Sequence, residues 1–300
     1  LGDQLLPIAR DSRLQDIKQT ITLVDGTLLK ALPRIAEAMW LSTRTGTVHH
    51  AWRLHTQFEL DRHVPVQMTL TDGRNSGSSD EKTVLRQHLA ADHCYVMDRW
   101  YAQFTLFNDI HRAQSSYVCR VRDNSVFEVV EERPLDAAAA EGNVVRDVVV
   151  KTGLSKPVKQ QPDHPLRLIV VQVKPHEKRS NRKGNTGAGP SDGLLRIATN
   201  LLNVPPEIIA LLYLYRYTIE LFFRFYKHVL GCRHLLSDDP RGIEIQTYCA
   251  IIACMLISLT TGRKPTLRTY EMICYYFTGM ADEDELLAHL AKLQMHDMAK

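Results

Sequence analysis

A long apolar helix with a narrow polar stripe places the strongest constraint on how this chain can fold. Asn203 can cap such a helix, Pro205 and Pro206 suit its first turn, and Gly231 can end it. Apolar side chains occur on nearly every other side of the segment, which predicts one long helix buried in a protein core.

The polar stripe consists of Tyr213, Arg216, Glu220 and Lys227, in the spacing Y-x2-R-x3-E-x6-K. At about 100° per residue, the four side chains of an α-helix with this spacing lie within roughly 60° of one another. Arg216 and Glu220 are four residues apart, so an ion pair with a purely structural role is the alternative interpretation. A buried helix seldom carries polar residues without a role, and we treat all four as candidate site residues.

Two further acids stand at the ends of predicted strands. Residues 20–25 (T-I-T-L-V-D) and 93–98 (H-C-Y-V-M-D) are short apolar segments that finish on Asp25 and Asp98. Between them, two alternating segments joined by D-R-H predict a β-hairpin at residues 52–60 and 64–70. The other elements predicted here are a helix at residues 80–91 capped by Ser79 or Asp80, a helix at residues 100–110 and a strand at residues 116–121.

The composition changes between residues 124 and 198, where Val-rich segments are separated by polar linkers and Phe127 is the one large aromatic residue. This pattern predicts a β-rich insertion. Within it, residues 174–193 are basic at the front and Gly-rich behind, which predicts a mobile loop. A solvated hairpin tip and a DNA contact are equally good interpretations of that loop.

Whole-chain composition excludes several classes of protein. The formal charge of +3, from 37 Lys and Arg against 34 Asp and Glu, barely favours an anionic partner. The six cysteines lack the spacing of a zinc ribbon or a disulfide scaffold, so we expect buried reduced thiols. The longest apolar run, residues 250–259, is too short to span a bilayer, and no signal peptide opens the chain, so we expect a cytoplasmic protein without a membrane segment.

The polar stripe resembles the signature of the transposases of bacterial insertion-sequence family four. The flanking text Y-R-Y-T-I-E-L-F-F-R-F-Y-K is also similar to theirs, and the resemblance covers about residues 18–290. It implies an α/β, ribonuclease-H-like mixed sheet flanked by helices, with a β-rich insertion between the second Asp and the Glu. We therefore expect residues 1–123 to form the first part of the catalytic domain, residues 124–203 the insertion, and residues 204–300 the helical C-terminal part.

The resemblance also implies the chemistry. Asp25, Asp98 and Glu220 match the three acids of a DDE triad, in which they hold two Mg2+ ions, with Mn2+ as a substitute, for DNA cleavage and strand transfer. Arg216 and Lys227 are then expected to hold a phosphate, and Tyr213 to pack or to contact the DNA backbone.

We expect the partners to be the ends of the element, target DNA and a second copy of the chain, in a bacterial cytoplasm and at its nucleoid. The chain lacks an initiator Met and has 24 residues before Asp25, so we expect an upstream helical DNA-binding region to be missing. Two alternatives stay open: a ribonuclease-H-like nuclease that cuts without joining, and an inactive remnant that only binds DNA.

Overall fold

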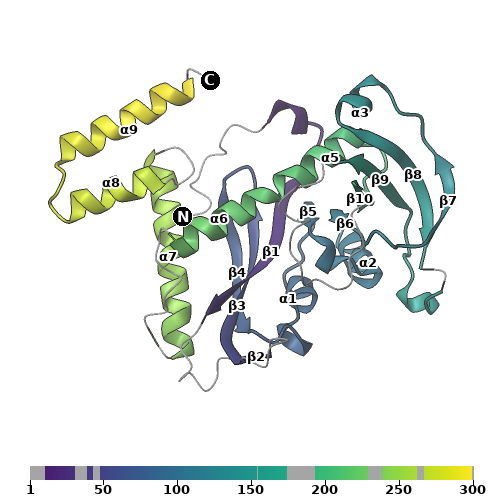
Figure 1. Ribbon diagram of the computed structural model, residues 1–300, viewed down its shortest axis with the longest axis horizontal. Coiled ribbons are helices and arrows are strands. Elements are labelled where there is room, and N and C mark those ends of the chain that lie inside the picture. The colour runs from purple at the N-terminus through teal and green to yellow at the C-terminus, as the bar shows by residue number, and fades with distance from the viewer. Residues whose placement is uncertain are drawn as a thin grey trace. The chain divides into compact units, whose positions relative to one another are not determined.

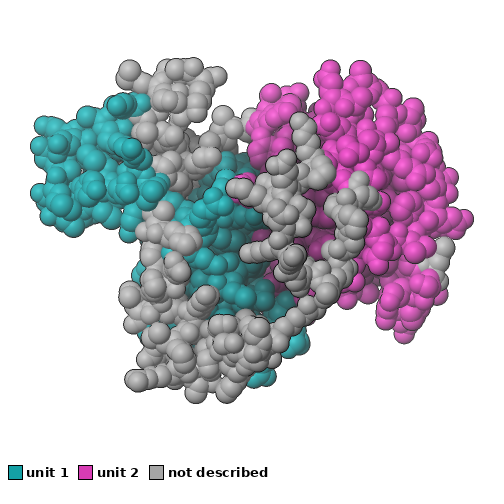
Figure 2. Space-filling model, in the orientation of Figure 1, with its two compact units in different colours: residues 1–10, 26–79, 218–300 teal, residues 11–25, 80–217 magenta. Residues whose placement is uncertain are grey.

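The computed structural model describes residues 11–30, 39–42, 48–153, 155–173, 193–228, 237, 239–261 and 267–298. Its residues fall into two compact units (Figure 2): unit 1 comprises residues 1–10, 26–79 and 218–300, and unit 2 comprises residues 11–25 and 80–217. Most of the predicted basic loop, residues 174–192, and the predicted helix end at Gly231 lie outside the described residues.

Unit 2 is built on a mixed sheet with the strand order β1-β5-β6-β10-β9-β8-β7 (Figure 1). Parallel pairing joins β1 to β5 and β5 to β6, and antiparallel pairing joins β6, β10, β9, β8 and β7 in turn. The strands are β1 (Thr20–Lys30), β5 (His93–Met97), β6 (Ser116–Arg120), β7 (Phe127–Glu132), β8 (Val144–Thr152), β9 (Leu166–Gln172) and β10 (Leu194–Thr199). β7 to β10 fall within residues 124–203, the segment called the insertion below, and the predicted α/β class, a mixed sheet with helices, is confirmed.

Helices pack on this sheet. The ring of Phe107 in α2 stacks on that of Tyr117 in β6 with centroids 4.2 Å apart, and α5 contacts β5, β6, β8, β9 and β10. Asp80 caps α1 by accepting hydrogen bonds from the amides of Lys82 and Thr83, as the sequence predicts. The helical segments of unit 2 are η2 (Ser12–Leu14), α1 (Glu81–Gln87), η4 (Arg99–Tyr101), α2 (Phe104–Arg112), α3 (Ala137–Glu141), η5 (Val158–Gln160) and α5 (Pro206–Tyr215).

Unit 1 contains the predicted hairpin and the C-terminal helices. β3 and β4 pair antiparallel from Trp52↔Asp72 to Glu59↔Val64, with a bulge at Gln57/Phe58. β3 also pairs antiparallel with β2, from Met39↔Ala51 to Ser42↔Val48. β1, which enters unit 1 at Gly26, follows β3 in the strand order. The elements are β2 (Met39–Ser42), β3 (Val48–Glu59), β4 (Val64–Asp72), η3 (Gly77–Ser79), α6 (Tyr217–His228), α7 (Pro240–Thr261), α8 (Leu267–Phe277) and α9 (Glu283–Met298).

The long helix predicted from the sequence is two helices, because α5 ends at Tyr215 and α6 begins at Tyr217. Arg216 between them keeps α-helical angles, but its amide donates to the Tyr213 carbonyl three residues back. The predicted cap is also wrong: Pro205, in an extended conformation, is the residue before the first turn, and it makes no side-chain cap hydrogen bond.

Burial of these two helices is incomplete. Leu214 is 70% exposed and Leu221 is 42% exposed, whereas Ile209, Leu212 and Phe222 are buried. The prediction of a helix buried on nearly all sides is therefore wrong. Apolar composition alone does not decide which face of a helix meets a neighbour.

Helix α7 (Pro240–Thr261) extends well beyond the apolar run at residues 250–259. Among the described helices, its segment Arg241–Leu259 has the length and composition to cross a membrane, and 39% of that window is buried. Length and composition alone are weak evidence, because the core helix of a soluble protein meets the same test. One side of α7, with Ile243 and Cys254, is buried, while Ile245 and Ile252 on the other side are exposed.

A buried ion pair fixes the insertion to the loop that leads into α5. Arg167 in β9 makes two hydrogen bonds to the carboxylate of Asp147 in β8, at 2.8 and 2.6 Å, and both side chains are 3% exposed. The same guanidinium donates to the carbonyls of Leu201, Leu202 and Val204 at 2.9, 3.3 and 2.6 Å. The start of α5 thus depends on a side chain of the insertion.

A second buried polar group joins β6 to the segment before β9. His164 Nε2 lies 3.0 Å from the Tyr117 hydroxyl, and Nδ1 lies 3.1 Å from Asp163 Oδ1. The His164 ring stacks on that of His111 with centroids 4.3 Å apart. Burial lowers the pKa of His164 below its usual 6.5; the bond to Asp163 opposes this, and the charges of His111 and Arg112 add to it.

We expect Arg167→Met to lower the free energy of unfolding by about 3–5 kcal/mol, because it leaves Asp147 buried without its partner. The double variant Arg167→Met/Asp147→Leu should recover part of the loss, because no charge then remains buried. Urea unfolding of the three proteins measures both effects. A single-variant loss below about 1 kcal/mol, the value of an exposed pair, would contradict this role.

We expect the protein to lose stability as the pH falls below about 6.5, because the folded state holds His164 neutral more strongly than the unfolded chain does. The stabilisation that comes from keeping His164 neutral is fully present above the pKa of His164 in the unfolded chain. It declines as the pH drops toward the lower pKa of His164 in the folded protein. Urea unfolding at a series of pH values, compared with His164→Phe, measures it. An equally steep decline in the variant would show that other groups cause it.

Candidate active site

The two predicted aspartates occupy neighbouring positions on parallel strands. β1 and β5 pair in register up to Val24 and Met97, and Asp25 and Asp98 are the next residues on each strand. The Asp98 carboxylate accepts a hydrogen bond of 2.7 Å from the Trp100 amide and so caps η4. Parallel neighbours bring the carboxyl ends of both strands to one edge, so the two acids lie side by side.

The prediction that Asp25 ends its strand is wrong, because β1 continues to Lys30. Pairing with β5 ends at Val24, and Asp25 is the last residue of β1 in unit 2. The acid therefore lies where the strand leaves its parallel partner rather than where the strand stops.

Asp25 and Asp98 begin a row of neighbouring residues at this edge of the sheet, and Arg120 is the third member of the row. The sequence did not predict Arg120 as a site residue. β5 and β6 are paired up to Met97 and Cys119, so Arg120 stands beside Asp98 in the register. Its Nε is buried without a hydrogen-bond partner, and its Nη2 lies 3.6 Å from Asp123. A single arginine at the end of a strand has no spacing pattern that would mark it as a site residue. The available signal was the predicted strand at residues 116–121, whose end would lie beside Asp98 if the two strands were parallel neighbours.

The thiol of Cys119 lies behind the row. It donates a hydrogen bond of 3.2 Å to the backbone carbonyl of Asp98. Burial, and to a smaller degree the charge of Asp98, raises the pKa of this thiol well above its usual value. The protonated thiol is a poor metal ligand, so the donors that this edge offers are the hard oxygens of the two aspartates.

Arg216 brings a cation to the row from the end of α5. Its Nη1 lies 3.5 Å from Asp25 Oδ2, and the two side chains are 17% and 21% exposed. The guanidinium carbon also lies 5.9 Å from the centroid of the Tyr213 ring. The predicted stripe residues Arg216 and Tyr213 therefore meet at the aspartates, although the helix is interrupted at Arg216.

Tyr213 is surrounded by groups of the row. Burial raises the pKa of its phenol above 10; the charges of Arg216 and Arg120 lower it, and those of Cys119 and Asp98 raise it. The phenol therefore stays neutral near pH 7 and keeps a proton that it can donate to a phosphate oxygen.

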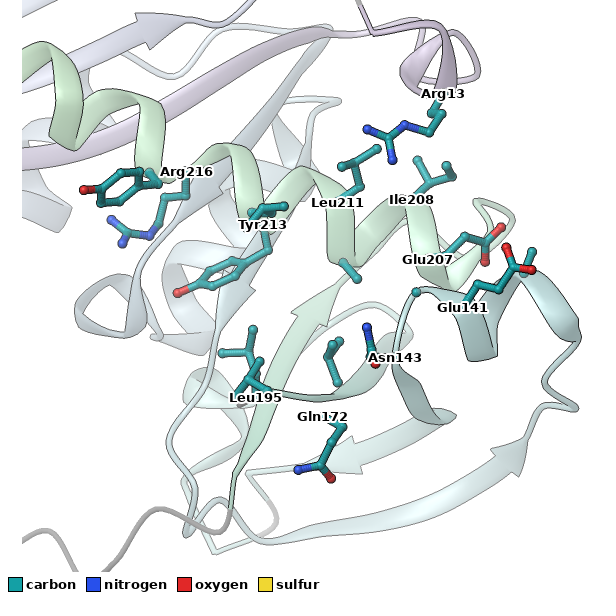
Figure 3. A pocket seen from close by; sticks show the side chains of 17 residues that line it. Arg13, Glu141, Asn143, Gln172, Leu195, Glu207, Ile208, Leu211, Tyr213 and Arg216 are labelled. Atoms are coloured by element: carbon teal, nitrogen blue, oxygen red, sulfur yellow. The ribbon is translucent and has the colours of Figure 1, made fainter. Parts of the chain in front are cut away.

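A cavity of about 820 Å³ lies along α5 in unit 2 (Figure 3). Tyr213 and Arg216 line one end, and Glu141 and Glu207 lie close together at the other. Residues of α3, β9, β10 and η2 complete the wall, so the insertion forms part of it. The end lined by Tyr213 and Arg216 suits a phosphate, whereas the carboxylates of the other end repel one.

Glu220 and Lys227 are on α6 in unit 1, and both are half-buried. Glu220 lies in the first turn of α6, where the helix dipole favours a carboxylate. The helix is held within the unit by Phe222, whose ring centroid is 5.2 Å from that of Phe58, and by a 3.1 Å hydrogen bond from Tyr226 to Thr247. In the described part of the chain, no three His, Cys, Asp or Glu residues are grouped closely enough to hold a metal ion.

Comparisons with known proteins find transposases among the relatives of this chain. One relative, named as transposase y4zB of Sinorhizobium fredii (strain NBRC 101917 / NGR234), is 27% identical over 207 residues, which are 69% of this chain and 52% of the relative. Another, named as a transposase for the insertion sequence element IS5377 of Geobacillus stearothermophilus, is 25% identical over 212 residues, 68% of this chain and 48% of the relative. The chain thus spans about half the length of the curated relatives that it matches.

A solved structure, the synaptic complex of piggyBac transposase with hairpin DNA, has a TM-score of 0.47 to this chain at 10% identity, covering 91% of this chain and 57% of that one. The family model described as "Transposase DDE domain" matches residues 16–256, which include both aspartates, the insertion and the polar stripe. The resemblance to DDE transposases predicted from the sequence is confirmed, and the chain belongs to the transposase DDE domain family.

Proposed function

We propose that this chain is the catalytic core of a transposase of insertion-sequence family four, which cleaves and joins DNA at the ends of its element. The observation that carries the proposal is the row of Asp25, Asp98 and Arg120 on adjacent parallel strands, with Arg216 3.5 Å from Asp25. Carboxylates beside guanidinium groups supply both metal ligands and phosphate contacts, which phosphodiester chemistry needs.

Enzymes of this family depend on divalent metal ions, and the donor set of the row fits such ions. We assign Mg2+, with Mn2+ as a substitute, because Asp25 and Asp98 offer adjacent hard oxygens. As the resemblance implies, Asp25, Asp98 and Glu220 would hold the ions. When bound, the ions activate water or a 3′-hydroxyl and neutralise charge on the leaving oxygen.

The side chains around the acids would orient the DNA. The Arg216 guanidinium, 3.5 Å from the Asp25 carboxylate, would also contact a DNA phosphate. Arg120 stands beside Asp98 in the strand register, and the Tyr213 phenol has a raised pKa, so we assign both as further donors to the DNA backbone. As the resemblance implies, Lys227 would be a further phosphate contact.

We further propose that two copies act together, since joining two DNA ends requires two active sites, and that the protein works at the bacterial nucleoid in the cytoplasm. The residues 1–123, 124–203 and 204–300 would then be the first catalytic part, the insertion and the helical C-terminal part. The insertion would stabilise the catalytic part, because Arg167 of the insertion binds the loop at the start of α5.

We expect Asp25→Asn, Asp98→Asn and Glu220→Gln each to slow nicking and joining by about a hundredfold or more, roughly 2.7 kcal/mol, while DNA binding is retained. Each substitution removes the negative charge of the carboxylate and leaves the size of the side chain nearly unchanged. Asp109→Asn is the matched control, because that carboxylate pairs with Arg86 at 2.7 Å on α1. The assay follows cleavage and strand transfer of duplexes carrying the element's ends, with Mg2+ or Mn2+.

Near-normal turnover in one of the three variants would remove that residue from the triad. Wild-type protein that cuts without joining would identify a ribonuclease-H-like nuclease. Metal-independent binding with no nicking would identify an inactive remnant.

We expect Arg216→Ala and Lys227→Ala each to lower the salt slope of DNA binding by about one, and equally for all sequences, because each contacts one phosphate. Arg120→Ala should do the same. Binding is measured by fluorescence anisotropy over a series of salt concentrations, with Arg86→Ala as the control. If these cations are only structural partners, the free energy of unfolding should fall while the salt slope stays unchanged.

A further inference from the structure

A hydrogen bond ties the segment before β1 to the last residue of α5. The Tyr215 hydroxyl donates to Asp11 Oδ2 at 2.7 Å. Arg13 holds the same carboxylate, with Nε 3.0 Å from Oδ1 and Nη2 2.7 Å from Oδ2, and the Arg13 amide donates to Oδ1 at 3.0 Å. Asp11 is therefore an oriented acceptor rather than a free surface acid.

The acceptor stays charged under physiological conditions. The hydrogen bonds from Arg13 and then from Tyr215 hold the pKa of the Asp11 carboxyl well below its usual range. A hydroxyl that donates to an ionised carboxylate makes a shorter and stronger bond than it would to a neutral oxygen. The Tyr215 ring is thus held by an interaction that persists at neutral pH.

The segment that carries Asp11 is itself anchored in unit 2. Leu14 and Ile17, which follow Asp11 in and after η2, are 1% and 2% exposed. The Leu14 amide also donates to the Asp11 carbonyl at 2.9 Å. Movement of Asp11 would therefore disturb buried side chains, so the carboxylate is a fixed point for the end of α5.

The end of α5 determines the position of Arg216. Arg216 follows Tyr215 directly and is the residue at which the helix is interrupted. Its amide bonds to Tyr213 three residues back, and its Nη1 is 3.5 Å from Asp25. An interrupted turn is held by fewer backbone hydrogen bonds than a continuous helix, so side-chain contacts decide its geometry.

We propose that Asp11 and Tyr215 are positioning residues, whose hydrogen bond fixes the end of α5 so that the Arg216 guanidinium meets Asp25 and a DNA phosphate. This inference rests on the proposed role of Arg216 as a phosphate contact. The proposal assigns the phosphate contact to Arg216 and no DNA contact to Asp11 or Tyr215.

The salt slope of DNA binding separates positioning from a merely structural role. Tyr215→Phe deletes one hydroxyl and leaves the net charge at neutral pH unchanged. The slope reports how many phosphates the protein neutralises, so loss of a neutral hydroxyl changes it only by moving a cation. We expect Tyr215→Phe to lower the slope by about one, as Arg216→Ala does, with no further change when the two are combined.

The control is Tyr248→Phe, which deletes the same hydroxyl from a tyrosine that is 47% exposed on α7. It should retain the wild-type slope. Asp11→Asn is the second variant, in case Tyr215→Phe unfolds at the assay temperature. It should also lower the slope, although loss of an anion by itself would favour DNA binding.

The outcomes are distinct. A normal slope in Tyr215→Phe and Asp11→Asn, with a reduced slope in Arg216→Ala, overturns the positioning role and leaves the proposed function standing. A normal slope in Arg216→Ala, or no DNA binding by the wild type, overturns the phosphate contact on which the inference rests. An equal drop in Tyr248→Phe also overturns it, because the effect would not depend on Asp11.

Discussion

The register of three parallel strands is the constraint on which the rest of unit 2 depends. β1 pairs with β5, and β5 with β6, so that Asp25, Asp98 and Arg120 follow the last paired residues of their strands. Because side chains alternate along a strand, a slip of one residue would turn all of a strand's side chains to the other face. The buried strands β5 and β6 resist such a slip, since it would expose core residues such as Tyr95.

Helix α5 is held at both ends by side chains from distant parts of the sequence. Arg167 of the insertion binds the carbonyls of the loop that leads into it, and Asp11 binds its last residue, Tyr215. Both contacts involve ionised groups and are formed where backbone groups of a helix terminus lack intrahelical partners. The insertion and the segment before β1 therefore share one effect, the placement of Tyr213 and Arg216 at the aspartates.

Local charge, rather than net charge, determines what this edge of the sheet can bind. The formal charge of +3 is spread over 300 residues, whereas Arg216 lies within 3.5 Å of a carboxylate that is 21% exposed. Acids without neighbouring cations would repel a phosphate, and cations without acids would hold a phosphate but no metal ion. The combination supports the nucleotidyl-transfer chemistry proposed for this member of the DDE transposase family.

The sequence alone determined the elements that local periodicity encodes: the hairpin, the β-rich insertion, the cap at Asp80, and the two acids that follow apolar segments, together with the family. Only the tertiary structure decided that α5 begins after Pro205 and stops before Arg216, that Asp25 lies within its strand, and that Arg120 stands beside Asp98. The physical reason is that periodicity and capping act over a few residues, whereas strand register and the contacts at a helix end join residues far apart in the chain.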